Sequence, residues 1–146
     1  MEIKIKRLKE NAILPSRGSA SAAGYDLYAC LDSDSVTIEP NTNVKIGTGL
    51  SIAVPEGYFG AIFARSGLAA KENLRPANCV GVADSDYRGE YIVALHNDGS
   101  QPKVVKNGDR IAQLVVMPYL SVEFNEVDEL DETDRGAGGF GSTGKR

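Results

Sequence analysis

The chain has 146 residues and a mass of 15.6 kDa, which suits one domain with a sizeable core. Its composition, 42% hydrophobic and 25% charged, is that of an ordinary soluble globular protein. Because 20 acidic side chains outnumber 16 basic ones, the net charge of -4 gives no positive field for nucleic acid or an anionic membrane, and neither is expected as a partner.

The first part of the chain predicts short β-strands. Residues 1–6 alternate polar and apolar side chains and lack the apolar core of a signal peptide, so we expect a first strand and no secretion. Residues 22–30 predict a second strand, in which Asp26 is either a satisfied structural acceptor or a site residue. Further strands are predicted at 36–38, 44–54 and 58–63, at the spacing of a β-sandwich or barrel.

Residues 64–74 change to a helical spacing and predict one short helix at about 66–74. Two interpretations of its start stay open. In the first, Ser66 caps the helix and Arg65 is a surface charge. In the second, the helix-start amides, the hydroxyl and the guanidinium form an anion pocket, which requires other anion-binding groups elsewhere in the chain.

The segment 78–95 carries two apolar runs around an acidic turn that ends in glycine, and it predicts a β-hairpin. A hairpin alone does not explain Tyr87, because a solvent-facing turn gains little from an exposed aromatic ring. The spacing of Asp84, Asp86 and Gly89 imitates the start of an EF-hand loop. Leu95 stands where that loop needs a bidentate carboxylate, so the calcium interpretation is rejected.

After the hairpin, residues 110–118 predict a strong strand in which Gln113 alternates with apolar residues. Residues 122–134 are acidic and predict one last strand followed by a solvated linker. The tail, residues 135–146, has the glycine-rich composition of a flexible segment. Its partial matches to dinucleotide-binding and Walker A loops lack the strand and helix that such loops require, so both are rejected.

Cys30 and Cys79 are the chain's two cysteines. They lie in apolar surroundings without CxxC spacing, so we expect two buried free thiols and a reducing compartment such as the cytoplasm. No apolar stretch approaches the roughly 20 residues needed to cross a bilayer.

Five segments together resemble the motifs of the trimeric deoxyuridine triphosphatases (dUTPases), in that family's order and spacing. They are Ala23-Gly24-Tyr25-Asp26-Leu27, Ala64-Arg65-Ser66-Gly67, Gly81-Val82-Ala83-Asp84-Ser85-Asp86-Tyr87-Arg88-Gly89, Gly108-Asp109-Arg110-Ile111-Ala112-Gln113-Leu114, and Arg135-Gly136-x-Gly138-Gly139-Phe140-Gly141-Ser142-Thr143-Gly144. The resemblance implies an all-β, jelly-roll-like sandwich or barrel with one short helix. It also implies a β-domain at 1–134, a flexible glycine-rich lid at 135–146, and a homotrimer with shared active sites.

The activity implied by the resemblance is hydrolysis of dUTP to dUMP and pyrophosphate with Mg²⁺, which keeps uracil out of DNA and supplies dUMP for thymidylate synthesis. Asp84 is implied as the carboxylate that activates the water attacking the α-phosphorus, and Tyr87 as the ring under the deoxyribose. The remaining implied substrate-binding residues are Arg65, Ser66, Gly67, Asn78, Val82, Ala83, Ile92, Gln113, Arg135, Phe140, Gly141, Ser142 and Thr143. No direct metal ligand is expected, and Asp26 would act only through the metal's water shell.

One departure from the family pattern bears on function. The family usually has a bulky aliphatic residue immediately before the catalytic aspartate, and this chain has Ala83. A buried void there could cost a few kcal/mol and loosen Asp84. This departure leaves open a nucleotide-binding or regulatory relative with weakened catalysis. A dCTP deaminase of the same fold is a separate alternative that also stays open.

Overall fold

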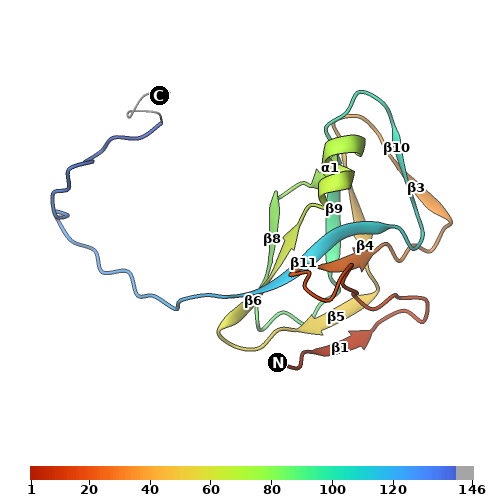
Figure 1. Ribbon diagram of the computed structural model, residues 1–146, viewed down its shortest axis with the longest axis horizontal. Helices are drawn as coiled ribbons and strands as arrows, with labels where there is room; N and C mark the ends of the chain where they lie inside the picture. The colour runs from red at the N-terminus through yellow and green to blue at the C-terminus, as the bar shows by residue number, and fades with distance from the viewer. Residues whose placement is uncertain (141–146) are drawn as a thin grey trace.

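Short antiparallel strands make up almost all of the regular structure in the computed structural model, which describes residues 1–140 (Figure 1). The strands are β1 (Lys4–Arg7), β2 (Tyr25–Tyr28), β3 (Ser35–Ile38), β4 (Asn43–Gly47), β5 (Leu50–Ala53), β6 (Tyr58–Phe63), β7 (Leu74–Pro76), β8 (Val80–Ala83), β9 (Ile92–Asn97), β10 (Lys103–Lys106) and β11 (Arg110–Pro118). The helix in the described part of the chain is α1 (Ser66–Glu72).

The strands form two main sheets. One has the order β2-β11-β6-β8 and the other β4-β9-β7, and two-stranded pairs β1-β5 and β10-β3 complete the fold. Alternate residues of β9 are buried, as expected for a strand with one face on a core. The core draws Leu27 from one main sheet and Ile46 and Leu95 from the other. This is the predicted all-β, jelly-roll-like architecture.

Two element boundaries differ from the prediction because of single backbone positions. The predicted strand at 44–54 is two strands, divided at Gly49, whose φ is 68°. A Cβ at Gly49 would lie 2.8 Å from Cys30 Sγ, so glycine is required there for both conformation and space. The helix ends before Asn73, which adopts a left-handed φ of 57°, and the chain then enters β7, a strand that the sequence did not predict.

The predicted hairpin at 78–95 is wrong in its pairing, although both of its strands exist. β8 pairs with β6 in one sheet, whereas β9 pairs with β4 and β7 in the other. β7 covers β9 only from Leu95 to Asn97, so the start of β9 lies unpaired opposite β8. The two strands are therefore the walls of an opening, with the turn at one end of it.

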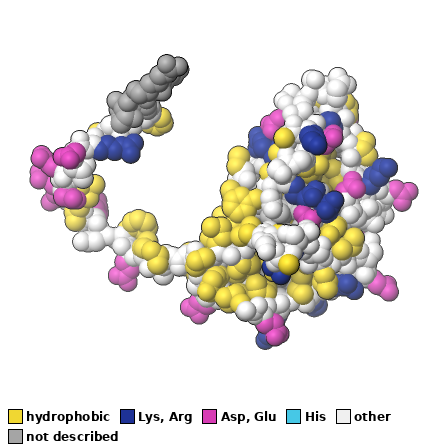
Figure 2. Space-filling view, in the orientation of Figure 1, with side chains coloured by type: hydrophobic (Ala, Val, Ile, Leu, Met, Phe, Trp, Pro, Cys, Tyr) yellow, Lys and Arg dark blue, Asp and Glu magenta, His cyan; other side chains and the backbone are white. Residues whose placement is uncertain are grey.

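The chain leaves the body after β11 as a long extended segment (Figure 1). The strand predicted within 122–134 is absent from the described residues. Leu120, Val122 and Phe124 are exposed there, and Figure 2 shows apolar side chains along this segment and on the face of the body from which it leaves. An apolar segment without contacts of its own cannot form a stable strand in isolation.

The cysteine prediction is half right. Cys30 is buried, and Cys79 is exposed in a turn with a φ of 63°. Both are free thiols, as expected. Among residues 1–140, no helix is long and apolar enough to cross a membrane.

Candidate active site

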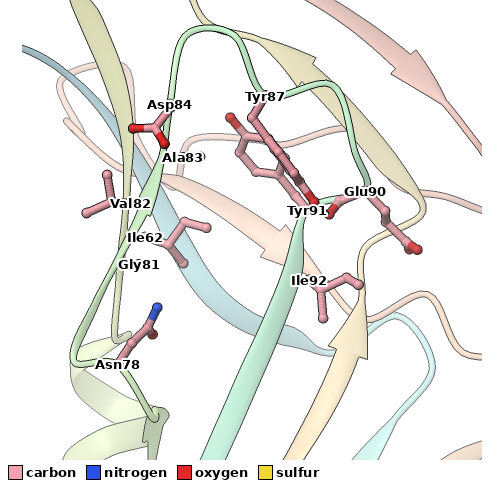
Figure 3. Close-up of a pocket in the computed structure, with 10 residues that line it drawn as sticks. All are labelled: Ile62, Asn78, Gly81, Val82, Ala83, Asp84, Tyr87, Glu90, Tyr91 and Ile92. Carbon is pink, nitrogen blue, oxygen red and sulfur yellow. Dashed lines mark hydrogen bonds between the residues drawn. The ribbon is translucent and has the colours of Figure 1, made fainter.

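A cavity of about 190 Å³ lies between β8 and the start of β9 (Figure 3). Six residues predicted for the substrate site line it: Asn78, Val82, Ala83, Asp84, Tyr87 and Ile92. Four other lining residues, Ile62, Gly81, Glu90 and Tyr91, were not predicted. The structure thus gathers the central motif around one opening.

The cavity has polar groups at its two ends. Asn78 lies at the end near the start of β8 with its amide directed into the opening, and Asp84 lies at the other end, just after β8 (Figure 3). Between them, a Cβ at Gly81 would be 3.1 Å from Ile62 Cβ and 3.3 Å from Asn78 Nδ2. Glycine therefore keeps the wall close to the Asn78 amide without filling the slot.

The turn after Asp84 is held by hydrogen bonds to backbone oxygens. The Tyr87 amide donates to the Asp84 carbonyl at 3.1 Å, and the Tyr87 hydroxyl donates to the Glu90 carbonyl at 2.9 Å. Arg88 donates to the Ser85 carbonyl at 2.7 Å, so its guanidinium is committed to the turn. These bonds fix the Tyr87 ring beside Asp84 while leaving it 43% exposed, which explains an exposed aromatic residue in a turn.

Glu90 does not act as a second carboxylate beside Asp84. One of its oxygens accepts a hydrogen bond of 2.7 Å from the Gly49 amide, on the side of β5. Asp84 forms no ion pair with the described part of the chain and is exposed at the cavity mouth. A carboxylate in that setting is free to hold a water molecule.

Tyr91 is the lining residue least expected from the sequence, since it stands in an apolar run like an ordinary core residue. Only 1% of its surface is exposed, and its hydroxyl has no hydrogen-bond partner within residues 1–140. Burial raises its pKa to about 12, with a smaller contribution from Tyr87. The Tyr87 and Tyr91 rings lie 6.0 Å apart, tilted by 42°.

A second polar cluster lies at the opposite edge of the sheet that contains β8, around Asp26 on β2. Asp26 on β2 accepts a 2.7 Å bond from Arg65 Nε and a longer one, 3.4 Å, from Arg110. The prediction that Arg65 could be a simple surface charge is therefore wrong. Asp26 is a satisfied acceptor, its carboxylate held between two guanidinium groups.

The capping interpretation of Ser66 is also wrong, because Arg65 is the N-cap residue and no side chain caps the helix. Ser66 and Gly67 form the exposed first turn of α1. Gln113 on β11 donates to the Ala64 carbonyl at 2.8 Å, which ties the strand to the segment before the helix. Hydroxyl, amide and guanidinium groups thus converge near the helix start.

The two clusters are far apart within one chain. Asp26, Gln113, Phe63 and Val80 lie in one row across the four strands of the sheet. Because neighbouring strands lie about 4.8 Å apart, three strand spacings place Asp26 roughly 14 Å from Val80. Asp84 follows Val80 by four residues in the direction of β8, which increases its distance from Asp26 further. One triphosphate bound at Asp84 could not reach the Arg65 cluster of the same chain.

The predicted tail residues also lie away from the cavity. Arg135 Nε donates to the Gly138 carbonyl at 2.8 Å within the tail, and the Phe140 ring is fully exposed. Gly141, Ser142 and Thr143 lie outside the described residues.

The carboxylates of residues 1–140 suit a metal ion that is held mainly by a bound substrate and not by protein side chains. Residues 1–140 contain no cluster of three or more His, Cys, Asp or Glu side chains that could cage a metal ion. Asp84 stands at the cavity mouth as a single free carboxylate. This donor set fits Mg²⁺ bound through phosphate oxygens and water.

Comparison with known proteins gives consistent results. The family model described as dUTPase matches residues 10–144. A deoxyuridine 5'-triphosphate nucleotidohydrolase from Desulfitobacterium hafniense (strain DSM 10664 / DCB-2) is 54% identical over 147 residues, spanning 99% of this chain and 97% of that protein.

Two solved structures of phage proteins are similar across most of the chain. A point mutant of the Staphylococcus bacteriophage 80alpha dUTPase with dUpNHpp has a TM-score of 0.88 and 28% identity, and the match covers 98% of each chain. A point mutant of the dUTPase from phage phi11 of S. aureus has a TM-score of 0.78 and 26% identity, covering 88% of this chain and 98% of that one. That structure is described as revealing the coordination of a structural Mg(II) ion.

Proposed function

The chain belongs to the dUTPase family, and we propose that it hydrolyses dUTP to dUMP and pyrophosphate in the cavity between β8 and β9. The observation that carries this proposal is the open slot between β8 and β9, two strands that do not pair with each other, with Asp84 and Tyr87 together at its mouth. The related phage enzyme solved with dUpNHpp, a dUTP analogue, supports the same substrate.

Uracil is the base that this slot suits. β8 is an edge strand and the start of β9 is unpaired on the side that faces it, so backbone amide and carbonyl groups are available to the base. The Asn78 side chain adds an amide that can donate and accept at the closed end. Such a fixed pattern matches the uracil edge, whereas the 4-amino group of cytosine presents a donor in place of an acceptor.

The position of Asp84 supports a role in activating water. With the base at Asn78, the sugar and α-phosphate extend toward Asp84 at the mouth of the slot. The carboxylate accepts the water proton while the water oxygen bonds to the α-phosphorus and the bond to the bridging oxygen breaks, releasing pyrophosphate. Because a carboxylate is a weak base, placement of the water supplies much of the rate.

Tyr87 supplies the sugar selection. Its hydroxyl is tied to the Glu90 carbonyl, which fixes the plane of the ring beside Asp84. A ring held in that plane packs against the deoxyribose and leaves no room for a 2′-hydroxyl. Rejection of UTP thus follows from steric exclusion by a group that cannot move aside freely.

The phosphate-binding groups must come from another subunit, so we propose a homotrimer with shared sites. The groups proposed to bind the phosphates lie together near β2 and β11, away from the β8 edge of the sheet and from Asp84 of their own chain. They are Arg65, Ser66, Gly67 and Gln113. The exposed apolar segment after β11 offers a surface for assembly. Arg135, Phe140, Gly141, Ser142 and Thr143 would complete the same site as a lid carried by that segment.

Magnesium is proposed as the cofactor. Substrate phosphate oxygens and water would hold it near Asp84, and Asp26, already paired with two arginines, would contribute at most through water. When bound, the ion neutralises charge on the triphosphate. Chelation by EDTA is expected to abolish turnover, and added Mg²⁺ to restore it.

The direct test is a substrate panel of dUTP, UTP, dCTP and dTTP with Mg²⁺, in which pyrophosphate and ammonia are both measured. We expect pyrophosphate from dUTP alone, and release at least about 100-fold slower from the Asp84→Asn variant. Dependence on Mg²⁺ without discrimination between dUTP and UTP would refute the sugar assignment. Ammonia released from dCTP would revive the deaminase alternative, which the comparisons do not favour.

Subunit sharing has a separate test that uses two inactive variants. Asp84→Asn removes the carboxylate proposed to accept the water proton. Ser66→Glu places a negative charge among the groups proposed to bind the phosphates, while glutamate remains compatible with a helix start. If the sites are shared, reassembled mixtures regain about a quarter of the wild-type activity, because that fraction of sites draws an intact half from each variant. If both halves come from one chain, mixing restores nothing.

A further inference from the structure

Asn78, the residue proposed to read the base, lies in a tight turn between β7 and β8. The Cys79 amide donates to the Pro76 carbonyl at 3.0 Å, which closes the turn around Ala77 and Asn78. Cys79 adopts a left-handed φ of 63°, a conformation that is unfavourable for a residue with a side chain. A strained turn keeps its shape only where surrounding contacts hold it. The contacts that hold this turn therefore also determine where the Asn78 amide points.

The guanidinium of Arg75 makes such contacts. Its Nη1 donates to the Pro76 carbonyl at 3.3 Å, to the Ala77 carbonyl at 3.5 Å and to Cys79 Sγ at 3.6 Å. One nitrogen thus reaches three of the four residues of the turn. Arg75 is not one of the residues that line the cavity, so its effect on a bound base must pass through the turn.

Asp98 fixes the orientation of this guanidinium. Its carboxylate accepts two hydrogen bonds from Arg75, one of 2.6 Å from Nε and one of 2.9 Å from Nη2. Asp98 directly follows β9, and its amide donates to the Asn73 carbonyl at 2.9 Å, so the carboxylate is attached to the end of a sheet. Because the carboxylate occupies Nε and Nη2, Nη1 is left to face the turn. The single amine of lysine cannot reproduce this arrangement.

The exposure of this ion pair argues against a mainly structural role. The side chains of Arg75 and Asp98 are 34% and 43% exposed. Exposed ion pairs contribute little to overall stability, because water and salt screen them. The pair is therefore better suited to setting the geometry of one turn than to holding the fold together.

We infer that Arg75, held by Asp98, is a positioning residue for base selection, and that it acts through the turn on Asn78. This inference rests on the proposed function, because it assumes that Asn78 reads the base. Without the guanidinium, the Asn78 amide can adopt other orientations, and the discrimination between uracil and cytosine falls. Asp84 and Tyr87, at the other end of the cavity, remain in place, so the chemical step is unaffected (Figure 3).

The test measures the binding of dUpNHpp and of its cytosine counterpart, dCpNHpp, by calorimetry with Mg²⁺, which needs no turnover. The preference for uracil, given by the ratio of the two dissociation constants, should fall about fivefold in Asn78→Ala, the change expected from one neutral hydrogen bond. It should fall at least about twofold in Arg75→Met, in Arg75→Lys and in Asp98→Ala, which releases the guanidinium. Lys9→Met is the control and should keep the wild-type preference, because Lys9 is also 34% exposed and paired with an aspartate, Asp32, away from the cavity.

A double variant separates positioning from a general structural effect. If Arg75 acts through Asn78, Arg75→Met has no further effect on the preference in the Asn78→Ala background. Additive losses in the double variant, or an unchanged preference in Arg75→Met, overturn the inference. In turnover of dUTP, Arg75→Met should raise KM at least about twofold and leave kcat unchanged. A fall in kcat, or failure of Arg75→Met and Asp98→Ala to fold, shows a structural role and overturns the inference as well.

The wild type distinguishes failure of this inference from failure of the proposed function. A wild type that releases pyrophosphate from dUTP and prefers dUpNHpp, combined with Arg75 variants of unchanged preference, refutes the inference alone. A wild type without this activity or this preference refutes the proposed function, and the inference with it.

Discussion

The pairing of Ala83 with Tyr91 predicts that replacing Ala83 by isoleucine damages the protein. Ala83 is 7% exposed, and the Tyr91 hydroxyl and Leu114 both approach its register partner Gly60 closely. Three additional carbons at position 83 would enter space that is already occupied. Overpacking of this kind costs about 1–3 kcal/mol, which for a chain of this size lowers the Tm by about 3–9 °C.

The decisive measurement is a double-mutant cycle followed by thermal unfolding. Tyr91→Val alone leaves a cavity and costs about 2 kcal/mol. The double variant Ala83→Ile/Tyr91→Val exchanges the large and small residues, so its cost should be smaller than the sum by about 2 kcal/mol. Val82→Ile is the control, because the neighbouring Val82 is exposed and tolerates the extra carbon.

The rate gives a second criterion. If Ala83 weakened catalysis by leaving a void, Ala83→Ile would raise the rate of pyrophosphate release. The structure predicts a lower rate instead, because displacement of Tyr91 disturbs the wall beside Asp84. An Ala83→Ile variant with unchanged Tm, additive double-variant energies and an increased rate would refute this argument and support the hypothesis of a weakened enzyme.

Three further predictions concern the cavity. Asp84→Asn should lower kcat by at least about 100-fold, measured as pyrophosphate release, while dUpNHpp still binds in calorimetry; loss of binding would show a structural role instead. Tyr87→Ala should raise kcat/KM for UTP relative to dUTP, whereas Tyr87→Phe, which keeps the ring, should largely preserve the discrimination; an unchanged ratio in Tyr87→Ala would remove this residue from sugar selection. Because the pKa of Tyr91 is raised from 10.0 to about 12, the folded protein holds this proton more tightly than the unfolded chain, and the resulting stability, present below pH 10, is lost by up to about 3 kcal/mol as the pH rises toward 12. Unfolding measured across this range should show that loss in the wild type and in Tyr58→Phe but not in Tyr91→Phe, and an identical decline in all three proteins would contradict it.

Local patterns in the sequence were enough to predict most strands, whereas the residues that share a cavity were expected from the resemblance to the dUTPase motifs. β6 and β11 occupy the apolar runs at 58–63 and 110–118 that predicted them, and six predicted residues line the slot because they belong to one continuous segment. The missed features depend on contacts that a local pattern does not contain. The left-handed conformation of Asn73 ends the helix early, and long-range packing decides whether Tyr91 is an ordinary core residue or a cavity wall.

The error in strand pairing is the most informative one for function. Two apolar runs around a tight turn predict a hairpin, but a hydrogen-bonded hairpin would satisfy its own backbone and leave no slot. In the structure β6 pairs with β8, and β4 and β7 pair with β9, so each strand is satisfied on its outer side. The sequence could not indicate this because the competing partners are distant in the chain.

The same opening bears on the proposal that subunits share a site. The slot lies between two sheets and is open at the turn, where Asp84 and Tyr87 lie, and residues 1–140 contain no further helix or strand that covers that end. The cationic and hydroxyl groups near Arg65 are anchored to β2 and β11, which lie three and two strands away from β8, the edge strand that forms the slot. If the slot binds the nucleoside and the Arg65 cluster binds the phosphates, as proposed, one triphosphate can reach both only when two copies of the chain bring these parts together.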